Sequence, residues 1–409
     1  MKKIITNLIL VLVFLMVTNT KSIGQTAYIT NGGDNTVSVI NVTTNTVVAT
    51  IPVGTSPFGV SVSSDGSKVY ITNSGANTVS VINTSTNAVT ATIAVGSYPQ
   101  GIVVSQDGSK VYVANTNDNN VSVINTSTNS VLTTVTVGTG PIGVCISPDG
   151  SKVYVANYGT TTGNTVSVIN TTTNTVSATI TVGSQPLGVA VSPDGTKLYV
   201  TNDGTNTVSA INTSTNTVTA TIIVGNGPYG LSFSPDGSKV YVANYPGSIS
   251  VISTATNLVS NTITAGGNSE GVSVTPDGSE VYVANWGGNV SVVNTSNNSL
   301  LTTIPVGNQA NALGNFISTH VSSGIPSLEN ENNLISVYPN PARTIVTIHQ
   351  SSYSPNQQLT ITDIMGNVVY KETIKGIDNS ISISNLNNGV YFYQITSNIE
   401  TFRGKFIKE

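Results

Sequence analysis

The feature that most constrains the fold is a repeat that runs through most of the chain. The pattern Tyr-x-(Thr/Ala)-Asn occurs seven times. Its tyrosines are Tyr28, Tyr70, Tyr112, Tyr154, Tyr199, Tyr241 and Tyr282. They are 41 to 45 residues apart, and the longest interval holds an insertion at residues 160–163. A period in the low forties with strand-like composition predicts the blades of a β-propeller, and a β-solenoid is the alternative repeat fold.

Each repeat has the pattern of four short strands separated by turn residues. In one repeat we expect strands A to D at residues 101–105, 110–114, 121–125 and 131–137. Asp107-Gly108 between strands A and B favours a tight hairpin turn. A polar Asn-Thr-Ser-Thr-Asn stretch separates strands C and D. Four antiparallel strands joined by short turns make one propeller blade.

The ends of the repeat array predict a closed ring. The chain enters the array at a B strand, residues 27–30, so its first blade lacks strand A. After the seventh D strand, residues 301–306, an A-like segment follows at residues 311–317, with no Asp-Gly turn after it. This segment can complete the first blade, which leaves few exposed sheet edges. We therefore predict an all-β chain whose residues 25–318 form a seven-bladed β-propeller closed by a split blade.

The repeat resembles that of the YVTN β-propeller family. The resemblance is carried by Val-Tyr-Val-Ala-Asn, Thr-Val-Ser-Val-Ile-Asn and Ser-Pro-Asp-Gly, and it covers about residues 25–318. That family includes binding proteins, surface-layer components and relatives of propeller lactonases. The resemblance therefore implies the fold but no single activity.

Residues 1–24 have the organisation of a secretory signal peptide. Lys2 and Lys3 precede an apolar stretch at residues 8–17, and small residues lie before Gln25. A retained membrane anchor is the alternative, but the stretch is shorter than the roughly 20 residues that a spanning helix needs. Because Cys145 is the only cysteine, no internal disulfide can form. The exported protein is expected to depend on its core for stability.

The composition changes after the repeat array. A polar linker, residues 319–333, leads to residues 334–409, where charged residues are denser. Strand-like runs occur at residues 335–338, 345–349, 359–364, 381–383 and 390–395. Short strands at this spacing predict a small β-sandwich domain.

The C-terminal segment resembles the type A sorting domain of type IX secretion. The resemblance is carried by Tyr338, Pro339, Asn340 and Pro341, by Gly389 and Tyr391, and by Gly404, Lys405 and Lys408. It implies that the type IX secretion machinery exports the chain and that the domain is usually removed, with cleavage near residues 318–333. An ordinary immunoglobulin-like module is the alternative.

The propeller region offers little material for catalysis. Both histidines and both arginines of the chain lie outside residues 25–318. Metal sites and general bases usually need histidine or clustered carboxylates. The resemblance implies that a propeller lactonase would have His, Arg and acidic residues around its channel. We therefore expect no catalytic residue, metal site or cofactor, and we interpret Cys145 as a small buried filler in strand A.

The charged residues of this region also argue against nucleic acid as a partner. Five lysines stand against eleven acidic residues, whereas single-stranded nucleic acid needs a basic groove with aromatic platforms. Six of the acids belong to Asp-Gly turns, and each lysine lies three residues after such an aspartate. We interpret these side chains as solvated turn residues.

Comparison of the repeats separates two faces of the ring. Strand direction alternates, so the A–B and C–D turns lie on one face and the B–C and D–A loops on the other. The first face repeats with little change, whereas the second varies. Its variable column, at the start of strand A, reads Phe58, Gln100, Ile142, Leu187, Tyr229, Glu270 and Asn311. Its B–C loops carry Tyr158, Tyr245 and Trp286.

Aromatic side chains on one rim are typical of a recognition surface. We predict that this face binds a glycan or protein partner, through Phe58, Gln100, Tyr158, Leu187, Tyr229, Tyr245, Glu270 and Trp286. Drift among loops that only shield the blade tops is the alternative. The whole chain is thus expected to be a secreted or cell-surface binding module without catalytic activity and without a membrane span in its mature form. A lactonase-like hydrolase and a purely structural envelope protein are the other candidates.

Overall fold

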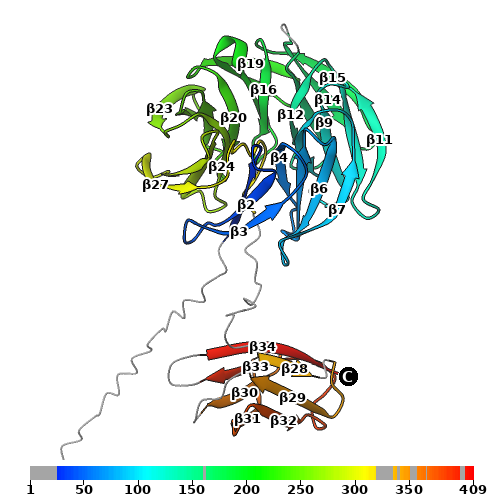
Figure 1. Cartoon of the computed structure of the whole chain (residues 1–409). Helices are drawn as coiled ribbons and strands as arrows, with labels where there is room; N and C mark the ends of the chain where they lie inside the picture. Colours follow the sequence, from blue (N-terminus) through cyan, green and yellow to red (C-terminus); the bar gives the residue numbers. More distant parts are fainter. Residues whose placement is uncertain are drawn as a thin grey trace, which may run out of the picture. The chain divides into compact units, whose positions relative to one another are not determined.

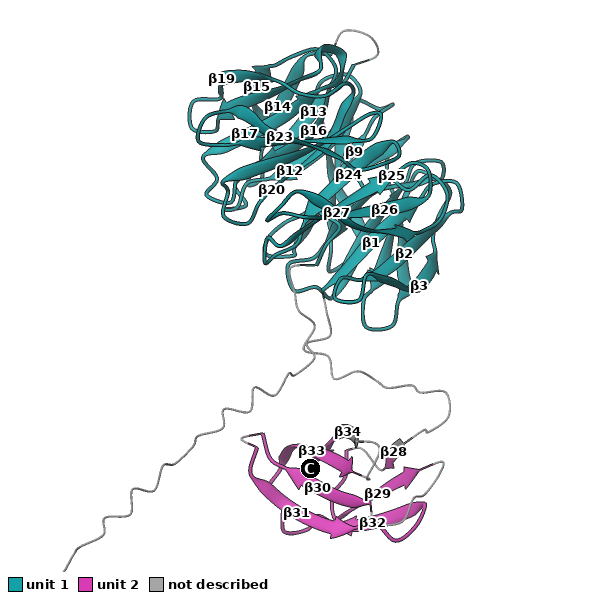
Figure 2. Cartoon of the chain, turned by 90° about the vertical axis from the view of Figure 1, so that its left-hand side faces the viewer, with its two compact units in different colours: residues 1–322 teal, residues 323–409 magenta. Residues whose placement is uncertain are grey.

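The computed structural model is all-β and contains two compact units, residues 1–322 and 323–409 (Figure 2). The structure describes residues 25–159, 163–318, 335–338, 341–350, 357–364, 366–396 and 401–409. The predicted signal peptide and linker lie outside the described residues, as does most of the insertion after Gly159.

The first unit is a propeller of seven blades arranged in a ring (Figure 1). Blade 1 contains β1 (Thr26–Asn31), β2 (Thr36–Asn41) and β3 (Thr46–Pro52); blade 2 contains β4 (Pro57–Val62), β5 (Lys68–Asn73), β6 (Thr78–Asn83) and β7 (Ala88–Ala94); blade 3 contains β8 (Pro99–Val104), β9 (Lys110–Asn115), β10 (Asn120–Asn125) and β11 (Ser130–Thr136); blade 4 contains β12 (Pro141–Ile146), β13 (Lys152–Asn157), β14 (Thr165–Asn170) and β15 (Thr175–Thr181).

The remaining blades repeat this order. Blade 5 contains β16 (Pro186–Val191), β17 (Lys197–Asn202), β18 (Thr207–Asn212) and β19 (Thr217–Ile223); blade 6 contains β20 (Pro228–Phe233), β21 (Lys239–Asn244), β22 (Ser248–Ser253) and β23 (Leu258–Thr264); blade 7 contains β24 (Ser269–Val274), β25 (Glu280–Asn285), β26 (Asn289–Asn294) and β27 (Ser299–Pro305). A single 3₁₀ turn, η1 (Asp203–Thr205), is the only helical element among the described residues. The four-strand pattern predicted from the repeat is confirmed.

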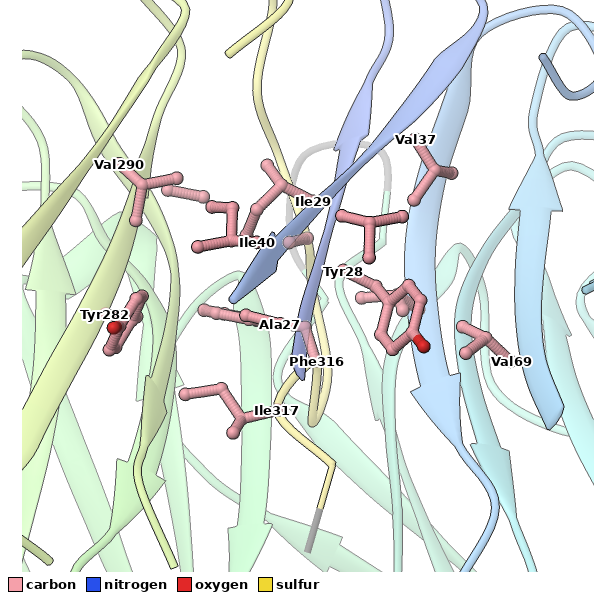
Figure 3. Close-up of a cluster of buried hydrophobic side chains, with 14 of the residues drawn as sticks. Ala27, Tyr28, Ile29, Val37, Ile40, Val69, Tyr282, Val290, Phe316 and Ile317 are labelled. Carbon is pink, nitrogen blue, oxygen red and sulfur yellow. The ribbon is translucent and has the colours of Figure 1, made fainter. Parts of the chain in front are cut away.

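The ring is closed by the segment of residues 308–318, which we call the closing segment. It pairs with β1 through the bridges Ala27↔Ile317 and Asn31↔Ala310. The Tyr28 amide donates to the Phe316 carbonyl at 2.9 Å. Phe316 is fully buried between blade 7 and blade 2, as Figure 3 shows. The predicted split blade is therefore present.

The repeated tyrosine and asparagine have separate structural roles. The tyrosines of blades 2 to 7 are among the largest fully buried side chains. Two of them reach the following blade, because the hydroxyls of Tyr199 and Tyr282 donate to Asn257 and Asn45. Within a blade, Asn73 Nδ2 donates to Ser80 Oγ at 2.9 Å. The motif thus links strand B to strand C and one blade to the next.

A glycine in strand A allows the innermost strands to approach closely. A Cβ atom on Gly143 would lie 2.1 Å from the Leu187 carbonyl oxygen of the next blade, and one on Gly101 would lie 2.0 Å from that of Ile142. Contacts this short are excluded for any larger residue. The glycine therefore permits this close approach of neighbouring blades.

The lysines at the start of strand B are not only solvated turn residues. Lys110 Nζ donates to the Thr171 carbonyl at 2.8 Å, and Lys152 Nζ donates to that of Thr213 at 3.2 Å. Both acceptors belong to the C–D turn of the next blade. The interpretation of these lysines as solvated residues was therefore incomplete, because the contact joins two blades and cannot be inferred from one repeat.

Each Asp-Gly turn holds its carboxylate in a small network of hydrogen bonds. Asp65 Oδ1 accepts from Ser63 Oγ at 2.6 Å and from the Ser67 amide at 3.0 Å. These bonds, with the Ser63 hydroxyl first, lower the pKa of Asp65 to about 2. Equivalent bonds lower the pKa values of Asp107 and Asp236 to about 2 as well.

We expect the melting temperature to fall as the pH decreases from about 4 to about 2, because the depressed aspartates become protonated over this range. A carboxylate whose pKa is depressed in the folded state contributes stability above its unfolded pKa of about 3.9, and that contribution is lost as pH falls through the folded value. Thermal unfolding followed by circular dichroism across this range measures the effect. The variant Asp107→Asn, which cannot titrate, should lose less stability over the same interval. A melting temperature independent of pH from 5 to 2 would contradict this account.

The second unit is a β-sandwich, as predicted. One sheet contains β28 (Ile335–Tyr338), β29 (Ile345–Gln350) and β32 (Asp378–Ser382), and the other contains β31 (Val368–Thr373), β30 (Gln358–Thr362), β33 (Gly389–Thr396) and β34 (Thr401–Lys408). The five expected strands are present, and β31 and β34 are additional. The core between the sheets includes Val346, Ile361, Ile395 and Phe406.

Candidate functional site

The two faces of the ring differ in the structure as they do in the sequence. We call the face of the B–C and D–A loops the loop face, and that of the A–B and C–D turns the turn face. The variable column occupies the second residue of each innermost strand, which is Phe58 in β4 and Tyr229 in β20. In blade 1 its counterpart is Asn311 in the closing segment.

Several side chains of this column pack against one another at the centre of the loop face. Ile142, Leu187 and Leu313 form one buried cluster, and Phe58, Tyr158 and Tyr229 pack against it. We call these six residues the mouth cluster. They come from several blades, so only the closed ring brings them together.

Burial divides the predicted binding residues into two groups. Gln100, Leu187 and Glu270 are buried, whereas Phe58, Tyr158 and Tyr229 are half-buried. These six predicted residues are therefore partly or fully enclosed at the centre of the loop face, and they do not form an exposed rim. Gln100 is also held in place, because its Oε1 accepts from Thr116 Oγ1 at 3.0 Å.

The exposed rim is formed by aromatic residues of the loops. Tyr245 is 51% exposed and Trp286 is 39% exposed, and each belongs to a B–C loop. Sequence reasoning missed Tyr98, which is 45% exposed and lies in the D–A loop before β8. Tyr98 has φ of 55° at a loop position where blades 4 and 6 have Gly140 and Gly227. The other described residues of this column with positive φ are glycine or polar, namely Ser56, Gly140, Gln185, Gly227 and Gln309. An aromatic residue among them is the signal that could have identified Tyr98.

Glu270 is the most unusual polar residue of the mouth. Burial raises the pKa of its carboxyl to about 8. Its Oε2 atom is enclosed and has no hydrogen-bond partner among the described residues, and the same holds for Oδ1 of Asn311. These two residues occupy the same column in adjacent blades. The mouth therefore contains polar atoms that the ring itself does not satisfy.

Tyrosines and a second carboxylate lie near Tyr229, the residue that precedes Glu270 in the variable column. Burial raises the pKa of the Tyr229 hydroxyl well above its usual value, and the charges of Glu270, Tyr158, Tyr98 and Asp203 add to the increase. The Tyr158 hydroxyl donates a hydrogen bond to Asp203 Oδ2 at 3.2 Å. Aromatic rings and carboxylates thus lie together at one end of the channel.

The remainder of the central channel is a cavity of about 580 Å³. It extends from the strand-A glycines, such as Gly143, to the A–B turns, where Pro148 and Pro193 line it. Cys145 lines this cavity and is half-buried, and burial raises the pKa of its thiol. A thiol with a raised pKa is a poor nucleophile. Cys145 was predicted to be a small buried filler of strand A; it lies in that strand but is only half-buried, because it lines the cavity.

Charge is distributed unevenly between the two faces. The lysines of the ring all begin a B strand and therefore lie at the turn face; they are Lys68, Lys110, Lys152, Lys197 and Lys239. The acids at the loop face are Asp34, Asp118, Asp203 and Glu270, and residues 25–318 place no lysine, arginine or histidine there. All charged residues of the loop face are therefore acidic.

No group of three or more His, Cys, Asp or Glu side chains within the described ranges could hold a metal ion. No helix there is long and apolar enough to cross a membrane.

The residues of the predicted sorting motif gather at one edge of the sandwich. Gly389 pairs with Lys408 and Tyr391 with Phe406 across β33 and β34. The rings of Tyr391 and Phe406 are stacked at 5.7 Å. Ala342, which follows Pro341, forms a parallel bridge with Lys408. Gly404 and Lys405 lie in β34 and Tyr338 ends β28, whereas Pro339 and Asn340 lie outside the described residues.

Comparison with protein families matches the C-terminal unit at residues 336–409, to a family described as a secretion system C-terminal sorting domain. The C-terminal unit carries a secretion sorting domain. The chain is therefore exported through type IX secretion to the cell surface or the extracellular space. The ring matches two β-propeller families over parts of its length: a seven-bladed propeller family described as lactonase at residues 18–148, and a YNCE-like β-propeller family at residues 150–245.

Solved structures show the same propeller fold. Hydrazine synthase of Kuenenia stuttgartiensis is 24% identical, with 62% of this chain and 87% of that chain covered and a TM-score of 0.56. A protein of unknown function from Desulfotomaculum acetoxidans is 16% identical, with 71% and 100% covered and a TM-score of 0.59. Dihydro-heme d1 dehydrogenase NirN is 15% identical, with 71% and 75% covered and a TM-score of 0.55. No curated protein matches the chain. These identities support the fold alone.

Proposed function

We propose that the ring is a non-catalytic binding module that recognises a partner outside the cell on its loop face. The observation that carries the proposal is the difference between the faces. The turn face repeats the same Asp-Gly turn, whereas the loop face combines the mouth cluster with three exposed aromatic residues, Tyr98, Tyr245 and Trp286. Exposed aromatic residues around a partly desolvated centre are the arrangement found at binding hot spots.

The double variant Tyr245→Ala and Trp286→Ala is expected to weaken binding at least tenfold, because hot-spot aromatics typically contribute more than about 1 kcal/mol each. The purified protein is first screened on glycan and peptide arrays, and the dissociation constant of the strongest binder is then measured for each variant. Leu132→Ala is the control, since Leu132 is exposed on β11, away from the loop face. Equal affinity of the double variant and the control would contradict the proposal.

A hydrolase is the second candidate, and the match of residues 18–148 to the lactonase family favours it. Against it, residues 25–318 contain neither histidine nor arginine, and propeller hydrolysis needs a group that can move a proton or polarise a carbonyl. Hydrolysis of γ- and δ-lactones by the purified protein distinguishes the two. A rate above that of buffer, abolished in a variant of the loop-face mouth, would replace the binding proposal. Failure to bind any array ligand would favour a structural envelope protein.

A further inference from the structure

Glu270 lies in the variable column at the centre of the loop face, where a bound ligand would contact its carboxyl group. Its column is the one whose side chains converge in the mouth cluster, and Glu270 stands between Tyr229 of blade 6 and Asn311 of blade 1. Glu270 is 8% exposed, and its Oε2 has no hydrogen-bond partner among the residues that the structure describes. A buried carboxylate without a partner is costly, so proteins usually retain one where something else completes it.

The ring does not supply the missing partner. All of its lysines lie at the turn face, at the opposite end of the channel. The other acids of the loop face are already bonded within the loops. Asp34 accepts from the Asn308 amide at 2.8 Å, Asp118 from the Ser97 amide at 2.7 Å, and Asp203 from Tyr158. Glu270 is thus the one loop-face acid in the described ring whose carboxylate is left for an external group.

The tyrosines at the centre of the loop face limit the chemistry of the external group that Glu270 can bind. Tyr229 lies close enough to Glu270, Tyr158 and Tyr98 for their charges to act on its hydroxyl. Tyrosine rings attract cations through their π faces, more strongly when water is excluded. A metal ion fits poorly, because Ca²⁺ takes six to eight oxygen ligands and Mg²⁺ needs a near-ideal octahedron. Asp203, the second carboxylate that acts on Tyr229, is already bonded to Tyr158.

From this geometry we propose that the centre of the loop face binds an organic ammonium group, with Glu270 as its anionic contact and Tyr229 of the neighbouring blade beside it. The proposal rests on the binding function above and names the chemistry that the face recognises. A primary ammonium, such as a lysine side chain, donates hydrogen bonds to the unpaired Oε2 and to Oδ1 of Asn311. The uniformly acidic loop face attracts the same cation over longer distances.

The proposal also predicts a dependence of binding on pH. Below the pKa of about 8 the Glu270 carboxyl is protonated, and an ammonium group must displace that proton. The affinity should therefore rise between pH 6 and pH 9, and binding at pH 7 should release a proton. The charge of Glu270 acts on the hydroxyl of Tyr229 in the neighbouring blade, and Tyr98, Tyr158 and Asp203 are the other titratable groups that act on that hydroxyl.

The test uses the full chain and two small probes: Nα-acetyl-lysine amide, and the same compound with its side-chain amine acetylated and therefore uncharged. Dissociation constants come from NMR titration, and proton release from calorimetry in two buffers of different ionisation enthalpy. We expect the charged probe to bind at least tenfold more tightly than the neutral one. Glu270→Gln should remove this preference, the proton release and the pH dependence.

Glu280→Gln is the matched control. Glu280 belongs to the same blade and is half-buried, but it begins β25 at the turn face, where its Oε2 lies 3.3 Å from the Tyr282 hydroxyl oxygen. This variant should bind as the original protein does, and the melting temperature of each variant shows whether it is folded. Equal binding of the two probes, or an unchanged affinity in folded Glu270→Gln, would overturn the proposal. If amine binding fails while Tyr245→Ala with Trp286→Ala still weakens an array ligand, the binding function stands and the ammonium site does not.

Discussion

A chain that ends at Val306 is expected to lose cooperative folding of the propeller and to aggregate. This shortened chain lacks the closing segment, so β1 keeps an unpaired edge and the blade 1 core loses Phe316 and Ile317. An exposed strand edge beside an open core is a template for association between chains. Thermal unfolding by circular dichroism and gel filtration measure the effect.

Two further variants separate the contribution of the closing segment to stability from that of the C-terminal unit. A chain that ends at Ser322 keeps the closing segment but lacks the C-terminal unit, and it should unfold at the temperature of the full chain. Phe316→Ala in the full chain should lower stability by about 3–5 kcal/mol, as expected for deleting a buried aromatic ring. If the chain that ends at Val306 melts like the chain that ends at Ser322, the ring does not depend on its split blade.

Removal of residues 323–409 is expected to reduce the protein at the cell surface and in the medium at least tenfold. This unit carries the sorting domain and has its own hydrophobic core, so its loss leaves the ring intact but without a signal for the secretion machinery. Cell fractionation with antibody detection of the ring measures the distribution between compartments.

Paired substitutions test whether export needs the terminal lysines of the sorting domain, and the melting temperature of each variant shows whether the domain is folded. Lys405→Ala with Lys408→Ala changes the predicted motif, where Lys408 Nζ donates to Asn388 Oδ1 at 3.4 Å. Lys371→Ala with Lys375→Ala removes the same charge elsewhere in the unit and is the control. We expect export to fall in the first pair and to persist in the second. Equal export of both pairs would show that the terminal lysines are not read by the machinery.

The sequence repeat was sufficient to predict the propeller because one blade repeats seven times. A strand that is ambiguous in one repeat is clear in the others, and the Asp-Gly turns mark the same hairpin in blades 2 to 7. The sandwich has no such repetition. Its β31 (Val368–Thr373) is mostly exposed, so the alternation of buried and exposed residues that identifies a strand is weak there, and it was missed.

The candidate site was predicted less completely for a different reason. The variable column could be recognised by comparing repeats, but the burial of Gln100, Leu187 and Glu270 depends on seven strands converging at one axis. The unpaired Oε2 of Glu270 likewise depends on which side chains arrive from other blades. Such properties belong to the closed ring, and the local pattern of a single repeat does not contain them.

Both ends of the propeller chain lie in blade 1, since the Ser318 amide donates to the Thr26 carbonyl at 2.9 Å. A pulling force that reaches the ring through the C-terminal unit therefore acts first on the hydrogen bonds between the closing segment and β1. If translocation exerts tension, we expect the closing segment to separate from β1, while the strands of the other six blades stay paired. Cutting the chain beyond residue 318 would relieve that tension and leave the closing segment paired with β1.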